Sequence, residues 1–285
     1  MAAELAAARW LSQSVKGAMA CFGVHPSTDA DFRFPSGVFR ETARRALGEE
    51  RPDPGGICGN NGCTEIATAA HSRTCTKGAE YTRRHNICVH AMESAARKET
   101  GLQGVEVEKS HMFLAHVGQA LRMDIVIQKD QLNTAERGKP SNLHLGQLWD
   151  HTYPDGTANK YRARAARVAG YAAEYAAKGK HTKYRGKFAA DQYTFLPFAV
   201  DQFGAACSDA HSLIRALALK QSQNSGGVWP LSQCVARWRQ RMSVALQRAV
   251  SESVARSLAR CTEPSQVGGP RPHPSQYLAV ALLVP

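Results

Sequence analysis

Four residues in a short stretch have the side chains and the spacing of a zinc site. They follow a C-x4-C-x7-H-x3-C pattern and are Cys58, Cys63, His71 and Cys75. Three thiolates and one imidazole form the closed tetrahedron of a structural zinc site, which leaves no open position for a substrate. Zinc bound here is expected to organise the chain and to contribute folding energy, and not to catalyse.

Other interpretations of this stretch stay open. The C-x4-C opening departs from the commoner C-x2-C spacing, so a set of unconnected thiols is the alternative. His85 and His90 follow closely and compete as ligands. The Cys/His stretch therefore predicts a metal knuckle over residues 57–78, directly in front of a basic segment.

The charge of the chain favours a partner rich in phosphate. Its 285 residues include 36 Lys and Arg against 24 Asp and Glu, a net charge of +12, and basic residues concentrate over residues 160–187. Each phosphate that such a surface neutralises releases counterions, which favours nucleic acid binding. A basic but inert surface is the alternative. The hydrophobic content of 43% is sufficient for a real core.

Cysteine usage and apolar runs indicate the compartment. Eight cysteines in a chain of this length are too few and too unevenly placed for a secreted disulfide scaffold. Charged residues interrupt the Ala-rich N-terminus, so it lacks the apolar core of a signal peptide. No run of about 18 apolar residues exists, and no membrane contact is expected. The sequence predicts a reducing, intracellular location.

Periodicity and turn residues predict a core of the order helix, three strands, helix, strand. The expected helices cover residues 1–20, 36–48, 80–100, 158–180, 206–222 and 230–260, and the expected strands cover 105–107, 123–127, 143–149 and 194–200. The order is typical of an α/β or α+β layer architecture. We divide the chain into an N-terminal helical extension (1–56), the knuckle (57–78), the core (79–222) and a C-terminal helical region with a flexible tail (223–285).

In this order the elements resemble a known nuclease family. The Cys/His knuckle precedes further matching segments, which are Arg84-His85-Asn86, Glu108, Arg122-Met123-Asp124, Lys180-His-Thr-Lys183-Tyr184 and Phe195-Leu-Pro-Phe198-Ala-Val200. They resemble the restriction-like endonuclease domain at the C-terminus of certain non-LTR retrotransposon polyproteins, a member of the PD-(D/E)xK fold. The resemblance covers about residues 57–220, and the order of the segments is more specific than any one of them.

The resemblance implies a catalytic site that uses Mg²⁺ or Mn²⁺. Acidic side chains would hold the metal, and a lysine would stabilise the charge that develops on the phosphate. Asp124 heads an apolar strand and is the expected metal ligand, Glu108 is a further acid, and Lys180 is the expected lysine, with Tyr184 packing beside it.

The second acid of the family is displaced in this chain. Gly146 or Leu148 occupies the place where the family carries an aspartate, and Asp150 is the nearest carboxylate that could substitute for it. Alternation along a strand decides which face Asp150 occupies, and the sequence leaves its register open.

Basic residues around this core are expected to contact nucleic acid. Arg83, Arg84 and His85 lie between the knuckle and the core, and Lys183 ends the basic helix. Contact with phosphate or capping of the first helix is expected for the first three, and His85 could instead be a buried core histidine.

Three functions follow from these patterns. The first is a DNA endonuclease that nicks one target strand, acts in the nucleus and has target DNA and also element RNA as partners. The second is a non-catalytic zinc protein that binds DNA or RNA. The third places catalysis at the knuckle, with His85 or His90 as base.

Overall fold

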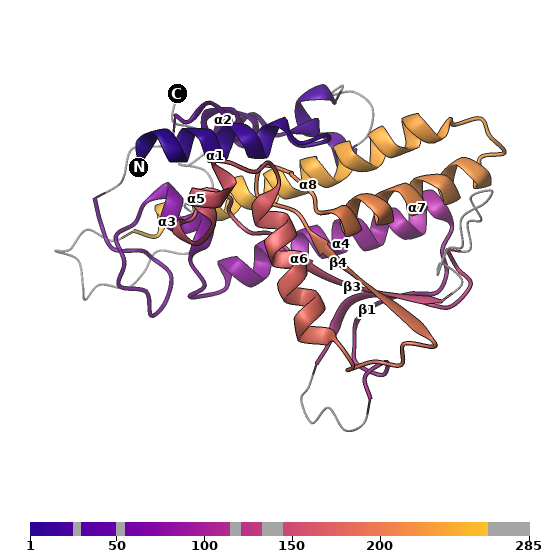
Figure 1. Cartoon of the computed structure of the whole chain (residues 1–285). Coiled ribbons are helices and arrows are strands. Elements are labelled where there is room, and N and C mark those ends of the chain that lie inside the picture. The colour runs from indigo at the N-terminus through magenta and orange to yellow at the C-terminus, as the bar shows by residue number, and fades with distance from the viewer. Residues whose placement is uncertain (25–29, 50–54, 115–120, 133–144, 262–285) are drawn as a thin grey trace.

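The strands form one mixed sheet of four, which lies beneath a layer of long helices in Figure 1, and side chains from helices pack on both of its faces. The computed structural model describes residues 1–24, 30–49, 55–114, 121–132 and 145–261. The strands are β1 (Val105–Lys109), β2 (Met123–Ile127), β3 (Gly146–Thr152) and β4 (Tyr193–Ala199). In the order β1-β2-β3-β4, the first three are antiparallel and β4 runs parallel to β3. The predicted mixed α/β class is therefore confirmed.

Most of the described chain outside the sheet is helical. The α-helices are α1 (Ala2–Ser14), α2 (Ser36–Leu47), α3 (Ala69–Thr74), α4 (Glu80–Thr100), α5 (Asn159–Ala165), α6 (Tyr171–Tyr184), α7 (Ser208–Asn224) and α8 (Leu231–Ala259). Two 3-10 turns cover Ala20–Gly23 and Ala30–Phe32. Among these described elements, no helix has both the length and the apolar character needed to cross a membrane.

The helix predicted at residues 80–100 is confirmed, and its end has a simple cause. Gly101 adopts a φ of +66°, a left-handed conformation that favours glycine, and its N–H bonds to the Arg97 carbonyl to cap the last turn. The helices predicted at 206–222 and 230–260 are confirmed as α7 and α8.

The single helix predicted over residues 158–180 is wrong, because the structure has two helices there. Gly170, at a φ of +71°, separates α5 from α6 and starts the second helix in a new direction. The predicted strand at 143–149 is β3, which begins at Gly146 and continues to Thr152; residues 143 and 144 lie outside the described part.

Side chains of the central strands alternate between two packed faces. Ile125 and Trp149 belong to a large core cluster with α4, α7 and α8, whereas Val126 and Leu148 pack with Tyr184 at the end of α6. Trp238 of α8 is 2% exposed within the larger cluster. The C-terminal helical region thus shares one core with the sheet.

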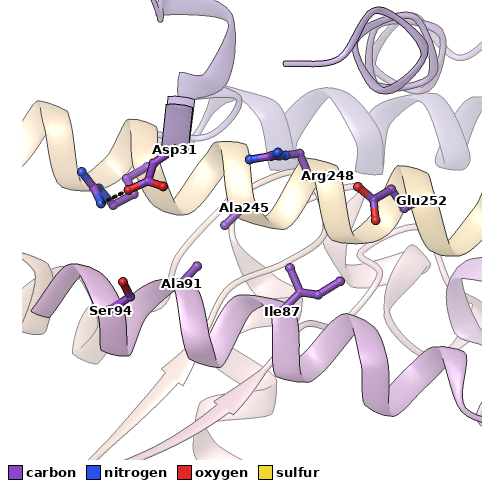
Figure 2. Close-up of a pocket in the computed structure, with 8 residues that line it drawn as sticks. Asp31, Ile87, Ala91, Ser94, Ala245, Arg248 and Glu252 are labelled. Atoms are coloured by element: carbon purple, nitrogen blue, oxygen red, sulfur yellow. Dashed lines mark hydrogen bonds and ion pairs between the residues drawn. The ribbon is translucent and has the colours of Figure 1, made fainter. Parts of the chain in front are cut away.

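Small side chains leave a pocket between α4 and α8. Figure 2 shows Ile87 and Ala91 of α4 facing Ala245 of α8 across it. Its volume is about 300 Å³, and charged residues of both signs, including Arg248 and Glu252, surround it.

A buried carboxylate organises the turn after β4. Asp201 is fully buried, and its Oδ1 accepts hydrogen bonds from the N–H groups of Phe203 (2.9 Å) and Ala205 (3.0 Å). Gly204 completes this tight turn with a φ of +95°. Burial raises the pKa of Asp201 from 3.8 to about 6, although the Ser12 hydroxyl and the two N–H groups act in the opposite direction.

We expect stability to fall with rising pH through this carboxyl group. Between about pH 4 and pH 6 the folded chain holds a proton on Asp201 that the unfolded chain releases, so a contribution of about 3 kcal/mol is lost across that window. Asp201→Asn mimics the protonated form and keeps an acceptor for the turn. It should raise the free energy of unfolding above pH 6, as urea denaturation at several pH values would measure.

Asp201→Ala is the matched control for this prediction. It removes the acceptor for Phe203 and Ala205 and should be destabilising at every pH. A difference between Asp201→Asn and the parent that stays constant from pH 4 to pH 7 would contradict the assignment.

Candidate functional sites: a Cys3His cluster and the Asp124 and Asp150 positions

The four predicted zinc ligands converge in the structure. Their sulfur and ring nitrogen atoms all lie within 4.8 Å of one another. Cys58 Sγ is 3.9 Å from Cys75 Sγ, and Cys63 Sγ is 3.2 Å from His71 Nε2. A tetrahedron with zinc–sulfur bonds of about 2.3 Å has edges of about 3.8 Å, so the donors and their spacing fit zinc. This group, the Cys3His cluster, could hold a metal ion such as zinc, and neither His85 nor His90 belongs to it.

A short hairpin supplies the first two ligands. Ile57 and Ile66 form an isolated antiparallel bridge, and Gly62 turns the chain between them with a φ of +74°. The N–H of Cys63 donates to the carbonyl of Asn60 at 3.0 Å, which closes the turn around the thiol pair. The polar, Gly-containing spacer of the C-x4-C pattern is what permits this shape.

Helix α3 supplies the other two ligands. Thr68 caps its start by accepting a hydrogen bond from the His71 N–H at 2.8 Å. The Cys75 N–H bonds to the His71 carbonyl at 2.7 Å, so both ligands lie one helical turn apart on the same side.

Ionisation of the thiols is linked to metal binding, because a metal ligand must be a thiolate. Burial raises the pKa of Cys58 to about 12. Burial would also raise the pKa of Cys75, but hydrogen bonds, first that of the Asn60 side chain, lower it below its usual value. Thiolates this close repel one another, and a divalent metal offsets that repulsion.

The knuckle is fastened to the core by a buried ion pair. Arg73 of α3 contacts Asp155 through an Nε–Oδ2 distance of 2.8 Å, and the two side chains are 3% and 2% exposed. The Thr157 N–H also donates to Asp155, at 2.9 Å. Burial would raise the pKa of Asp155, but the charge and hydrogen bond of Arg73 hold it below its usual value.

The knuckle also lies against the end of α8. A Cβ on Gly59 would come within 2.3 Å of the Arg260 backbone, so only glycine allows this approach. Arg256 and Arg260 both pair with buried Glu80 in the first turn of α4, at 3.0 and 2.7 Å. The knuckle, α4 and α8 therefore meet at one point.

The strand register answers the question left open for Asp150. Ile125 pairs with Trp149 and Val126 pairs with Leu148, so one further step along β2 and β3 sets Asp124 opposite Asp150. Asp150 shares the face of Leu148 and is 5% exposed. The register therefore puts the two residues at paired backbone positions, while the carboxylate of Asp124 contacts His85 and His151.

The two other positions considered for the second acid have structural roles. A Cβ on Gly146 would come within 2.5 Å of the Tyr193 ring, and Leu148 is buried in the core cluster with Val126 and Tyr184. Neither position has room for a carboxylate.

One lysine near the end of α6 contacts Asp150, and a second contacts Tyr184. Lys180 Nζ lies 2.7 Å from Asp150 Oδ1, and Asp150 Oδ2 is buried with no hydrogen-bond partner among the described residues. Lys183 Nζ donates to the Tyr184 hydroxyl at 2.8 Å. Burial and the negative charge of Asp150 raise the pKa of Tyr184 well above its usual value.

Two histidines surround the other carboxylate. Asp124 Oδ1 lies 3.2 Å from His85 Nε2, and Asp124 Oδ2 accepts the backbone N–H of His151 at 2.5 Å. Burial would raise the pKa of Asp124, but the hydrogen bonds from His151 and His85 hold it well below its usual range. Asp124 is thus an ionised carboxylate in a fixed orientation.

Glu108 does not join this pair. The β1–β2 register continues to a position opposite Asp124, but Glu108 has a φ of +52°, and its side chain is 53% exposed. It pairs with Arg122 at 3.3 Å. The structure therefore leaves its carboxylate at the edge of the sheet.

The predicted nucleic-acid contacts differ in exposure. Arg83 is exposed on the first turns of α4, whereas Arg84 is 3% exposed and lies 5.5 Å from the centre of the Tyr81 ring. Lys183 is exposed as a residue, and the partial desolvation of its ammonium group beside Tyr184 lowers its pKa. Phosphate contact stays a prediction for Arg83 and Lys183, while the buried position of Arg84 suits a structural role.

His151 is the site residue that the sequence reasoning missed. It is 1% exposed, its ring centre lies 4.8 Å from that of Phe198, and its Nδ1 lies 3.6 Å from Asp124. Burial lowers its pKa, which keeps the ring neutral. The only signal in the sequence was that His151 follows Asp150 at the end of a predicted strand. Because side chains alternate along a strand, His151 points to the face opposite to that of Asp150.

Comparison with known proteins adds no relationship to this geometry. A scan of protein-family models finds none that matches the chain, and a search of the curated proteins finds no matching relative.

Proposed function

We propose that this chain is a metal-dependent DNA endonuclease of the restriction-like, PD-(D/E)xK type, derived from a non-LTR retroelement. The observation that carries the proposal is the β2–β3 register, which continued by one step pairs Asp124 with Asp150, together with the distance of 2.7 Å between Lys180 Nζ and Asp150 Oδ1. Two acids on the central strands and a lysine beside one of them are the kinds of group that phosphodiester hydrolysis uses.

The arrangement of the elements supports the same proposal. Helix α4 precedes three antiparallel strands, and α6 precedes β4, which joins the sheet parallel to β3. This is the helix, three strands, helix, strand order that the family resemblance implies. Pro197 lies in β4, an edge strand, where its missing N–H costs no ladder bond on the free side.

Carboxylate oxygens are the donors that a hard divalent cation prefers. Asp150 Oδ2 is a buried carboxylate oxygen without a hydrogen-bond partner among the described residues, and Asp124 follows from the register as its pair on β2. Mg²⁺ or Mn²⁺ held there would polarise the phosphate and lower the pKa of bound water. Lys180 would stabilise charge on the phosphate, and His85 and His151 would keep Asp124 oriented and ionised.

The Cys3His cluster has a different role in this proposal. With four protein donors it leaves no open position, so zinc there would be structural and would hold the knuckle against α4 and α8. The third function, with catalysis at the knuckle, loses support because His85 contacts Asp124 and His90 is exposed outside the cluster.

The partner in this proposal is DNA, with element RNA as a second nucleic acid. The net charge of +12 and the exposed Arg83 and Lys183 support binding to phosphate backbones. Nicking one strand would release a 3′ hydroxyl for priming reverse transcription, and a target in chromosomal DNA would require a nuclear location.

One observation favours a second function, a non-catalytic nucleic-acid-binding protein. Both oxygens of Asp124 already have protein partners, and Asp150 is paired with Lys180. A decayed nuclease that keeps its fold would satisfy its former metal ligands in this way. The two functions differ in whether a divalent metal can displace these contacts.

Nicking of supercoiled plasmid DNA with Mg²⁺ or Mn²⁺ separates the two functions. We expect the parent chain to convert supercoiled to open-circular DNA, and Asp124→Ala, Asp150→Asn and Lys180→Gln each to slow this by at least about 100-fold. The rate of conversion to open-circular DNA, measured on agarose gels, is compared between the parent and each variant.

Two residues outside the proposed catalytic group supply matched controls. Lys178→Gln changes a lysine on the same helix as Lys180, and Asp209→Asn changes a carboxylate that pairs with His181 at 2.8 Å. Both should retain the parent rate. Equal rates for the parent and Asp124→Ala would remove the catalytic proposal, and saturable DNA binding by the parent without any nicking would establish the non-catalytic one.

A further inference from the structure

A second pocket, larger than the one in Figure 2, lies between α7, the start of α8 and the segment that follows α1. Its volume is about 670 Å³. The polar part of its lining consists of Lys16, His211, Ser212, Arg215, Ser232 and Arg239. Among the described residues that line it, none is acidic. We call this the α7–α8 pocket.

Arg239 has room in the α7–α8 pocket because residue 17 is a glycine. A Cβ on Gly17 would lie 2.7 Å from Arg239 Cδ, and Gly17 has a φ of +91°, so a larger residue there would displace the arginine. Arg239 Nε is buried and has no hydrogen-bond partner among the described residues. A buried donor without a partner is costly unless a ligand satisfies it.

His211 presents a second unsatisfied group. Its Nδ1 is buried without a partner in the described part of the chain. Burial lowers the pKa of His211, as do the charges of Arg239 and Lys16, whereas Glu174 acts in the opposite direction. Glu174 itself accepts the Ser208 N–H at 2.7 Å. The ring is therefore neutral and can donate one hydrogen bond.

We propose that the α7–α8 pocket binds a phosphate-bearing anion. Lys16 and Arg239 bring two positive charges to one cavity whose described lining contains no carboxylate, and a bound anion would offset their repulsion. The Arg239 guanidinium and the neutral His211 ring supply directional donors, as phosphate recognition requires. α8 also begins at this pocket, so the positive end of its dipole adds to the same field.

This inference is independent of the cleavage site. The pocket uses none of the residues Asp124, Asp150 and Lys180, and it would remain an anion site in a chain that does not cut DNA. The phosphate could belong to a nucleic-acid backbone or to a free phosphorylated compound, which share the same chemistry.

A thermal melt of the full chain in increasing inorganic phosphate, with ionic strength held constant by chloride, tests the pocket. We expect a saturable rise in melting temperature, because a ligand that binds only the folded state stabilises it. Arg239→Gln and Lys16→Gln should each weaken the apparent affinity about tenfold, as the loss of one charge-assisted contact predicts.

Arg248→Gln is the control for the change in net charge. Arg248 lines the pocket in Figure 2, where Asp31 and Glu252 are also present, so its loss should leave the phosphate response unchanged. Lys16 is exposed, so Lys16→Gln tests the pocket even if Arg239→Gln melts early. No response beyond that of chloride, or a full response in both pocket variants, would overturn the proposal.

A DNA-binding titration in salt then identifies the source of the phosphate. If a backbone phosphate occupies the pocket, Lys16→Gln should weaken duplex binding and reduce the salt dependence by about one phosphate contact. If a free phosphorylated compound occupies it, DNA binding should be unchanged while the phosphate response is lost. Either result upholds the anion site.

Discussion

Zinc bound by the Cys3His cluster is expected to stabilise the whole chain, so that its removal lowers the melting temperature by about 10 °C or more. Structural zinc contributes its binding free energy to folding, and small zinc modules are unfolded without it. In a chain of this size about 1 kcal/mol shifts the melting temperature by roughly 2–4 °C, so a loss of several kcal/mol is readily measured.

The loss of stability should extend beyond the knuckle, because the knuckle contacts both the core and α8. Gly59 packs on the Arg260 backbone, and Arg73 of α3 pairs with buried Asp155 in the core. When the hairpin and α3 lose their common metal, neither contact is held in place. The end of α8 would then lose packing that its pairs with Glu80 alone do not replace.

The measurement combines metal analysis with thermal melts. The purified chain should carry zinc, and Cys63→Ser and His71→Ala should lose it together with thermal stability, as should the parent in a strong chelator. Cys261→Ser removes a nearby thiol that is not in the Cys3His cluster and should retain both. A chain that purifies without metal and is indifferent to the chelator would show that these four residues are not a metal site.

The features predictable from the sequence are those encoded locally. The C-x4-C-x7-H-x3-C spacing brings its ligands together through one hairpin and one short helix, and the Gly101 cap ends α4 where the glycine stands. Each depends on residues only a few positions apart. Turn chemistry and helix capping are therefore enough to predict them.

The features that could not be predicted depend on pairing between distant segments. The pairing of Asp150 with Asp124 follows only from the β2–β3 register, continued by one step, and a shift of one residue would turn Asp150 to the other face. The contacts of Asp124 with His85 and His151 likewise join three elements. Glu108 matched a motif by position, but its left-handed φ turns it toward Arg122.

The burial of charged residues could not be predicted from the sequence either. Arg84 belongs to a basic run that indicates a surface, yet it is 3% exposed, and Arg73 is as deeply buried beside Asp155. A sequence shows that an arginine is present but not whether a carboxylate from another segment meets it. The pair of Arg73 and Asp155 makes the knuckle and the core depend on each other.

Breaking the pair of Arg73 and Asp155 is expected to destabilise the chain by about 3–5 kcal/mol, because removal of one partner leaves the other charge buried and unpaired. Arg73→Gln and Asp155→Asn would each be measured by urea denaturation, and the double variant should cost less than the two single changes added together. Arg83→Gln, the same substitution on an exposed arginine, should change the free energy of unfolding by less than about 0.5 kcal/mol.

The dependence on pH distinguishes a lost ion pair from lost packing. Arg73 is the main group that holds the pKa of Asp155 below its usual value, so in Arg73→Gln the burial of Asp155 raises that pKa instead. Asp155 then takes up a proton in mild acid and escapes the cost of a buried charge. The destabilisation of Arg73→Gln relative to the parent should therefore be smaller at pH 5 than at pH 8, whereas a packing defect would be the same at both. A constant difference across this range, or single variants that cost less than about 1 kcal/mol, would show that the knuckle does not depend on this pair for its attachment to the core.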